Sequence, residues 1–308
     1  MQKVTLGRSG LQVTIAGLGC GGFSRLGVGK FGLDHASTIV RTAYDNGVNF
    51  FDTATVYGTQ QAVGKGLEGL KRDSYVLSTK FPYGGKTAED MVKTLEESLK
   101  ELNTDYIDIY HLHGVKPEDY KWAVDTFLPV MQKAKEQGKI RFPGITEVFG
   151  TDTSHKMLSA SIADNLFDVI MVGYNLLNPS AAKKILPIAK EKNIGVLCMF
   201  AVRKALANPE QLEIDIAKIL ESGQADRADF EVQKPLDFLT HNGVSKSIME
   251  AAYRFCRHTK GIDVVLTGTS NADHLKDNIL SIQGDKLPED ILVRLEKMFG
   301  NVDCVSGQ

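Results

Sequence analysis

Eight short runs of β-branched, aromatic and other apolar residues recur along the chain, and most are followed by an amphipathic stretch with helical spacing. The runs occupy residues 14–21, 49–54, 75–80, 106–113, 139–146, 167–175, 193–200 and 262–268. Helical spacing is clearest at residues 33–47, 87–103, 152–165, 179–193 and 243–258. Strands that alternate with helices are typical of parallel sheets. Eight such units predict an α/β fold with a closed (β/α)8 barrel, the TIM barrel, and leave an open doubly wound sheet as the alternative.

The remaining segments fit around such a barrel. The chain has 308 residues, 43% of them hydrophobic, which suffices for one large core, so we expect a single domain over residues 1–308. Residues 4–16 predict an N-terminal β-hairpin that turns between Gly7 and Gly10 and covers the barrel floor. The polar residues 203–244 predict a long lid or binding loop at the C-terminal face, and residues 287–300 predict a final helix.

Charge and hydropathy exclude several classes of partner. Lys and Arg number 36 against 38 Asp and Glu, without a long block of one sign, so we expect no binding to nucleic acid or to an anionic membrane. No segment is apolar over the length of a membrane span, and the first residues carry no signal-peptide pattern. The four cysteines are far apart without metal-ligand spacing, which suits a reducing compartment. These features predict a cytoplasmic protein that acts on a small molecule and holds no metal, and they carry no signal for an oligomeric state.

The glycine-rich stretch Gly17–Gly22, GLGCGG, resembles a dinucleotide-binding fingerprint. A true fingerprint opens a helix at once, so that the amides of the first turn meet the pyrophosphate. Here residues 23–34 hold three more glycines before helical spacing begins. We therefore favour the barrel, in which a glycine such as Gly22 beyond a strand end lets a ligand approach the backbone closely.

Ionisable residues close three consecutive strand runs. Asp52 is near the end of the second run, Lys80 ends the third and His113 ends the fourth, while Tyr57 follows Asp52 by five residues. In a (β/α)8 barrel the C-terminal strand ends line one mouth, where catalytic sites are built. The sequence thus predicts that these four side chains meet at that mouth.

Such a set suits proton donation to a carbonyl group that receives hydride from another source. A lysine ammonium beside a phenol favours the phenolate, so Lys80 lowers the pKa of Tyr57 and makes it a better acid. Asp52 supplies the counter-charge that a lysine inside a barrel needs. His113 can orient the substrate oxygen by a hydrogen bond. His111 lies on the same face of its run, and we interpret it as a deeper residue of the barrel interior.

The chain resembles the aldo-keto reductase superfamily over nearly its full length. The resemblance rests on the motifs LGRSGLQVTIAGLGCGG, FDTATVYG, LSTK, TDYIDIYHLHG, GKIRFPGIT, YNLLN and LTGTSNADHLKDNIL, in this order. It implies a barrel that binds NADPH or NADH in extended form without a Rossmann fold. It also implies a catalytic tetrad that maps onto Asp52, Tyr57, Lys80 and His113, and it favours His113 over His111.

The chain departs from this resemblance where relatives hold the nicotinamide amide. After the fifth run, a common Ser-Asn pair is replaced by Thr146 and Glu147, and Met171 stands where the sixth run commonly carries Gln. Thr146 keeps a hydroxyl that donates and accepts, and Glu147 can accept a hydrogen bond from the amide. A buried charge on Glu147 is unfavourable, however, and Met171 removes one hydrogen bond.

The seventh run also departs from the common aromatic-Ser-Pro-Leu-Gly pattern. Met199 replaces the aromatic residue and can still pack against a nicotinamide ring. Arg203 and Lys204 follow, and either can bind the cofactor pyrophosphate or remain a solvated loop charge.

The segment after the eighth run is predicted to bind the adenosine end of the cofactor. Either Ser270 or Asn271 is the N-cap of a helix whose first turn offers backbone amides to a phosphate. By resemblance, an acidic-Asn pair contacts the adenine, and bases near the start of the helix favour NADP. The candidate contacts are Gly268, Ser270, His274, Asp277 and Asn278.

The predicted function is that of an NAD(P)H-dependent oxidoreductase of the aldo-keto reductase type. It would interconvert a small aldehyde, ketone or aldose and its alcohol or lactone, with Tyr57 as general acid and base. Arg203, Lys204 and His274 favour NADP(H) over NAD(H) as the cofactor. The main alternative is a nicotinamide-binding regulatory subunit that senses redox state with little turnover, and a Schiff-base aldolase that uses Lys80 is a remoter one.

Overall fold

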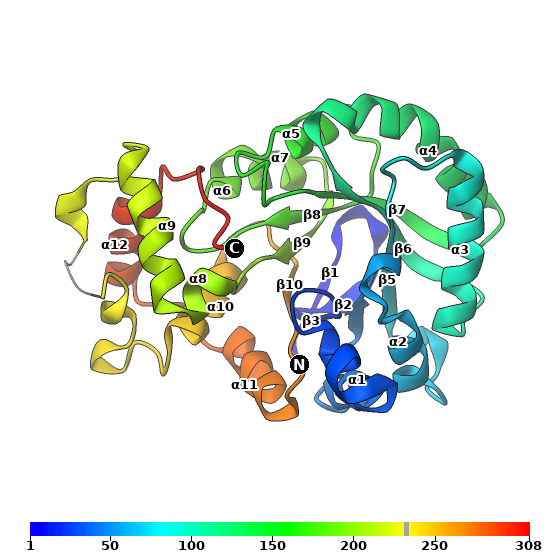
Figure 1. Cartoon of the computed structure of the whole chain (residues 1–308), viewed down its shortest axis with the longest axis horizontal. Coiled ribbons are helices and arrows are strands. Elements are labelled where there is room, and N and C mark those ends of the chain that lie inside the picture. The colour runs from blue at the N-terminus through cyan, green and yellow to red at the C-terminus, as the bar shows by residue number, and fades with distance from the viewer. Residues whose placement is uncertain (231–233) are drawn as a thin grey trace.

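Eight parallel strands form a closed barrel in the computed structural model, which describes residues 1–230 and 234–308 (Figure 1). The strands pair in chain order, and the last one pairs with the first. This confirms the predicted barrel and excludes the doubly wound sheet. The barrel strands are β3 (Ala16–Gly19), β4 (Phe50–Asp52), β5 (Val76–Phe81), β6 (Ile107–Val115), β7 (Ile140–Glu147), β8 (Val169–Gly173), β9 (Gly195–Met199) and β10 (Val264–Thr267).

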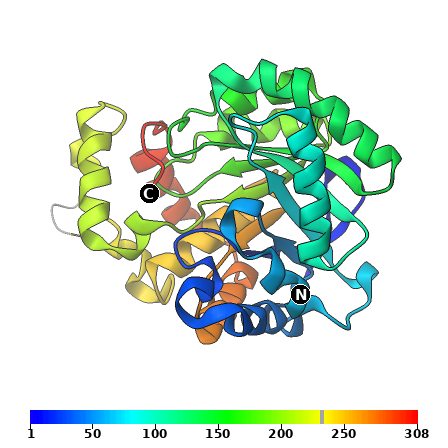
Figure 2. The same ribbon diagram turned by 45° about the vertical axis from the view of Figure 1, so that its right-hand side comes forward.

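Helices cover the outside of the barrel (Figures 1 and 2). Because both faces of each strand are covered, the strands are buried almost throughout, and all six residues of β5, including three polar ones, are buried. The helices are α1 (Val28–Asp45), α2 (Gln60–Leu67), α3 (Ala88–Leu102), α4 (Tyr120–Glu136), α5 (Lys156–Asp164), α6 (Ala181–Lys184), α7 (Leu186–Glu191), α8 (Lys204–Ala207), α9 (Pro209–Glu221), α10 (Ile248–His258), α11 (Ala272–Gln283) and α12 (Glu289–Phe299).

Helix α3 shows how local sequence fixes a boundary. Thr87 accepts a hydrogen bond from the backbone amide of Asp90, whose carboxylate in turn accepts from the Thr87 amide, which completes a capping box. Met91, Leu95 and Leu99 form its buried face. Asn103 ends the helix in a left-handed conformation, so the predicted boundaries at residues 87 and 103 are both confirmed.

The N-terminal hairpin closes the barrel floor, as predicted. Strands β1 (Lys3–Thr5) and β2 (Gln12–Thr14) pair antiparallel across a 3₁₀ turn, η1 (Gly7–Ser9). Leu6, Leu11 and Val13 pack in one cluster with inward-facing residues of seven barrel strands. The backbone amide of Arg8 donates to the Asn193 carbonyl just before β9, which fixes the hairpin to the barrel.

The segment predicted as a lid, residues 203–244, forms helices beside the barrel. Helices α8 and α9 pack with α10 and α12 around a second apolar cluster, and they lie together on one side of the molecule (Figures 1 and 2). Three further 3₁₀ turns follow: Arg227–Asp229, Asp237–Leu239 and His241–Gly243. Residues 231–233 of the predicted lid lie outside the described residues. No helix in the described part of the chain is long and apolar enough to cross a membrane.

Candidate active site

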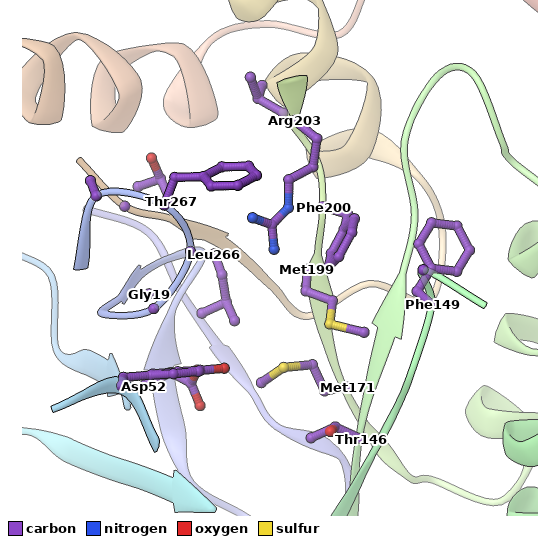
Figure 3. Close-up of a pocket in the computed structure, with 18 of the residues that line it drawn as sticks. Gly19, Asp52, Thr146, Phe149, Met171, Met199, Phe200, Arg203, Leu266 and Thr267 are labelled. Atoms are coloured by element: carbon purple, nitrogen blue, oxygen red, sulfur yellow. The ribbon is translucent and has the colours of Figure 1, made fainter. Parts of the chain in front are cut away.

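A cavity of about 630 Å³ opens at the C-terminal ends of the barrel strands (Figure 3). It collects side chains from most of the strand ends and from the loops that follow them. The predicted site residues that line it are Gly22, Asp52, Tyr57, Lys80, His113, Thr146, Glu147, Met171, Met199, Arg203 and Gly268.

A buried ion pair lies at the base of this cavity. Lys80 Nζ donates to Asp52 Oδ2 at 2.5 Å and to the Thr53 carbonyl at 2.7 Å. Burial alone lowers the pKa of the Lys80 ammonium, but the charge of Asp52 and the hydrogen bond to it outweigh burial and raise that pKa. Lys80 therefore keeps its proton although its side chain is only 1% exposed.

Tyr57 stands above this pair on the 3₁₀ turn η3 (Thr55–Tyr57). Lys80 Nζ lies 5.1 Å from the centre of its ring. The ring also packs on the backbone of Gly21, where an added Cβ would lie 2.5 Å from it, so no other residue fits at position 21 without moving Tyr57. Burial raises the pKa of the Tyr57 phenol, and the positive charge of Lys80 opposes this only in part. The sequence-based expectation of a lowered pKa is therefore wrong in sign for the net effect, although the influence of Lys80 has the expected direction.

The two histidines of β6 have separate surroundings. His113 Nε2 lies 3.2 Å from the Tyr57 hydroxyl, and burial with the nearby Lys80 charge lowers the pKa of His113 to about 3. Its imidazole is therefore neutral at physiological pH. His111 is fully buried, and its Nε2 lies 3.1 Å from Ser78 Oγ, below the cavity. The structure thus places His113, and not His111, on the cavity wall.

The residues around the expected nicotinamide amide offer few free polar groups. Thr146 Oγ1 accepts from the Gly114 amide at 2.7 Å, which leaves its hydroxyl hydrogen free to donate. Both oxygens of Glu147 lie 3.0 Å from His155 Nδ1, and one also accepts from the Gly173 amide. Burial raises the pKa of Glu147, and His155 opposes this. Glu147 lines the cavity, but its carboxylate is occupied by protein partners.

Arg203 enters the cavity from the loop after β9 (Figure 3). Its guanidinium stacks 3.7 Å above the ring of Phe200, which itself has a left-handed backbone conformation with φ of 69°. Its Nη1 lies 3.3 Å from where a Cβ would stand on Gly22. Arg203 is thus a cation beside a bare stretch of backbone, an arrangement that suits an anionic group. Lys204 also lines the cavity but is exposed.

The predicted adenosine contacts lie at the outer edge of the site. Asn271, not Ser270, is the N-cap of α11, and its side chain accepts from the amides of Asp273 and His274. Those two amides are therefore already satisfied within the helix. Ser270 accepts through its carbonyl from His35, and Asn278 donates to Thr267. Of the predicted contacts beyond β10, the cavity includes Gly268 but not Ser270, His274, Asp277 or Asn278.

Sequence reasoning missed several lining residues. Phe149 and Phe200 both line the cavity, with ring centres 5.5 Å apart at nearly a right angle. Tyr253 and Thr267, the latter at the end of β10, share a hydrogen bond of 2.8 Å and also line the cavity. Phe200 directly follows Met199 and Phe149 follows Glu147 by two residues, and this proximity to predicted site residues was the available signal.

Comparison with known proteins gives concordant matches. The profile described as "Aldo/keto reductase family" matches residues 17–298. L-galactose dehydrogenase of Arabidopsis thaliana is 28% identical over 293 residues, covering 90% of this chain and 86% of that protein. Aldo-keto reductase YhdN of Bacillus subtilis is 27% identical over 301 residues, covering 90% and 87%.

Solved structures share the fold. Aldo-keto reductase AKR11C1 from Bacillus halodurans, in its holo form, superposes with a TM-score of 0.73 at 23% identity, covering 99% of this chain and 98% of that one. An aldo/keto reductase from Klebsiella pneumoniae in complex with NADP and acetate gives 0.68 at 20% identity, covering 98% and 97%. The family profile spans far more than half of the chain, and the fold agrees with it. This chain belongs to the aldo/keto reductase family of NAD(P)H-dependent oxidoreductases.

Proposed function

We propose that this protein interconverts a small aldehyde, ketone or aldose and its alcohol or lactone, with Tyr57 as the general acid and base. One observation carries the proposal: the Tyr57 hydroxyl lies on the cavity wall, 3.2 Å from His113 Nε2, with the buried Lys80–Asp52 pair beneath its ring. These four residues come from β4, η3, β5 and β6. Together they can donate a proton to a substrate oxygen bound in the cavity.

The cavity fits a nicotinamide cofactor. Glycines line one side of the cavity: Gly22 leaves the backbone bare beside Arg203, whereas the Tyr57 ring at Gly21 and the Gly19 carbonyl at Gly268 occupy the place of a Cβ. On the other side, Met171 and Met199 supply polarisable apolar surface for a flat ring. Thr146 can donate to the amide oxygen, and Arg203 can bind the pyrophosphate. When bound, the cofactor supplies or accepts the hydride.

The side chains of the protein carry out the proton transfer. The raised pKa of Tyr57 keeps the phenol protonated at neutral pH, so it is ready to donate to a developing alkoxide. The Lys80 ammonium stabilises the phenolate that remains, and Asp52 keeps Lys80 charged. His113, as a neutral imidazole, orients the substrate oxygen by a hydrogen bond. In the reverse direction, the same phenolate accepts the proton of the alcohol.

The walls of the cavity support the proposed substrate class. Phe149 and Phe200 limit its size and favour a small substrate with some apolar surface. The sugar dehydrogenase activity in the name of the Arabidopsis relative supports the inclusion of aldoses.

Turnover on carbonyl compounds tests the proposed function. The purified protein should oxidise NADPH or NADH repeatedly in the presence of at least one member of a panel of small aldehydes, ketones and aldoses. Absorbance at 340 nm measures the reaction, and reduction of NADP⁺ or NAD⁺ with the corresponding alcohols measures its reverse. Cofactor binding without multiple turnovers on every compound would support the redox-sensing alternative.

We expect NADPH to bind at least as tightly as NADH. Arg203 and Lys204 line the cavity, and His274 is exposed at the start of α11, where a 2′-phosphate can meet it. A charge-assisted hydrogen bond to this phosphate contributes about 1.5–3 kcal/mol, which corresponds to roughly tenfold or more in affinity. Fluorescence titration at low salt measures both dissociation constants.

His274→Gln is the matched variant for this preference. It should weaken NADPH binding and leave NADH binding unchanged, because only NADPH carries the 2′-phosphate. Higher salt should also reduce the difference between the two cofactors. Tighter binding of NADH than of NADPH by the wild-type protein would contradict the preference.

A further inference from the structure

A buried chain of hydrogen bonds leads away from the cavity at Glu147. The Glu147 carboxylate contacts His155 Nδ1, and His155 Nε2 lies 3.1 Å from Ser180 Oγ. The side chains of Glu147 and His155 are both 0% exposed. Ser180 Oγ donates to Asn178 Oδ1 at 2.7 Å. The chain therefore runs from the cavity to the loop after β8.

The positions of the hydrogens in this chain can be assigned. Asn178 Nδ2 donates to the carbonyls of Thr153 and Val305, so its Oδ1 is an acceptor and takes the Ser180 hydroxyl hydrogen. Ser180 Oγ must then accept from His155, which puts a hydrogen on Nε2. A second proton therefore lies between His155 Nδ1 and the Glu147 carboxylate, and it joins the two side chains in a hydrogen bond.

His155 also holds an aromatic wall of the cavity. Its ring stacks on Phe149 with centres 5.3 Å apart and an angle of 10° between the planes. Phe149 is 1% exposed and lies so close to Gly173 that an added Cβ would be 2.1 Å from its ring. On its far side Phe149 meets Phe200, on which Arg203 stacks.

The backbone of His155 has an uncommon conformation. His155 is left-handed with φ of 63°, a region that few residues other than Gly adopt, although Asn, Asp and His are found there more often than the rest. Such a conformation persists where surrounding contacts compensate for its cost. Here the compensating contacts are those to Glu147, Ser180 and Phe149.

We propose that Glu147 and His155 are positioning residues that hold the Phe149 ring as a wall of the catalytic cavity and so determine how tightly the substrate binds. They do not contact the reacting atoms. Glu147 is thereby assigned a role other than the cofactor-amide contact expected from the sequence. This inference rests on the proposed reductase activity, since the KM of the carbonyl substrate is one of its readouts.

A double-mutant cycle tests whether Glu147 acts through Phe149. Glu147→Ala and Phe149→Ala should each raise the KM of the best carbonyl substrate about tenfold or more, with kcat within about threefold of wild type. The double variant should raise KM no further than the stronger single variant, because both changes remove the same wall. Multiplied effects in the double variant would overturn the proposal.

Glu147→Gln is the control for this cycle. Its amide can donate to His155 Nδ1 and its oxygen can accept from the Gly173 amide, so KM should stay within about threefold of wild type. The dissociation constant of NADPH, measured by fluorescence titration, should change less than about threefold in Glu147→Ala. A rise of tenfold or more there, or a KM in Glu147→Gln as high as in Glu147→Ala, would show direct contact with the ligands and overturn the proposal.

A second variant keeps the test possible if Glu147→Ala does not fold. If Glu147→Ala does not fold, Glu147→Gln/His155→Asn replaces it in the cycle, because this pair buries no unpaired charge and Asn adopts the left-handed conformation readily. The same increase in KM is expected, since the ring that stacks on Phe149 is gone. A KM equal to that of Glu147→Gln alone would overturn the proposal.

Hydrogen–deuterium exchange separates this inference from the proposed function. Absence of turnover by the wild-type protein would refute the function, but exchange at residues 148–153 still reports on the turn that carries Phe149. Exchange there should rise at least about tenfold in Glu147→Ala, or in its replacement variant, and remain at the wild-type level in Glu147→Gln. Equal exchange in all variants would refute the positioning role independently of activity.

Discussion

Tyr57→Phe should reduce carbonyl reduction by at least about a hundredfold while cofactor affinity remains near the wild-type value. A positioned general acid typically contributes about 10²–10⁴-fold to a rate, and this substitution removes the donated proton. The ring remains, so its packing on Gly21 and its place above Lys80 are preserved. Steady-state kinetics on the best substrate and a fluorescence titration with NADPH provide the two measurements.

Tyr110→Phe is the matched control for this prediction. Tyr110 is fully buried in β6, and its hydroxyl has no hydrogen-bond partner among the described residues. Removal of that hydroxyl should leave both activity and stability close to wild type. Retention of more than about a third of wild-type activity by Tyr57→Phe would refute the assignment of Tyr57 as the proton donor and favour the redox-sensing alternative.

The pH profile of the wild-type protein gives an independent test of the same assignment. His113, with a pKa of about 3, stays neutral above pH 5, and the pKa of Tyr57 is raised above its ordinary value near 10. The rate of reduction should therefore be level between about pH 5 and 8, and its alkaline decline should begin only as the phenol loses its proton.

Lys80→Met should lower both activity and stability. The substitution leaves the Asp52 carboxylate, 4% exposed, without its counter-charge, and breaking a buried pair in this way costs about 3–5 kcal/mol in the free energy of unfolding. Activity should fall because the phenolate of Tyr57 loses the ammonium that stabilises it. Urea unfolding measures the first effect and steady-state kinetics the second.

Two double variants separate these effects. Asp52→Asn/Lys80→Met removes both charges, so it should regain much of the lost stability but none of the activity. Tyr57→Phe/Lys80→Met should be about as active as the less active of the two single variants, because both substitutions disable the same proton transfer. A multiplied loss of activity would mean that Lys80 has a separate role in the reaction.

The position of the ionisable cluster was predictable because it depends only on strand order. Asp52, Lys80 and His113 come from three consecutive parallel strands, so their shared edge follows from the fold. The resemblance favoured His113 over His111, and the structure places His113 on the cavity wall and His111 deeper in the barrel. The sign of the net pKa shift of Tyr57 was not predictable, because it depends on how far burial outweighs the charge of Lys80.

The partner of Glu147 could not be predicted from the sequence. His155 follows it by eight residues, and the two meet across an irregular turn in which His155 has a left-handed conformation. The resemblance placed the adenosine end of the cofactor beyond Gly268, but the amides offered there depend on the local capping of α11 by Asn271.

The closure of the barrel constrains the biosynthesis of the protein. Strand β3 pairs with β10, so β3 cannot complete its pairing until the chain has been synthesised as far as Thr267. The glycines that follow β3 are synthesised first, yet Gly268, which packs on the Gly19 carbonyl, leaves the ribosome only after seven further barrel strands have been made. Domains larger than about 150 residues commonly populate partly folded states. A nascent chain that stops before β10 therefore carries the whole Asp52, Tyr57, Lys80 and His113 set with an open sheet edge and an incomplete cavity, and it needs protection from aggregation until the last strand arrives.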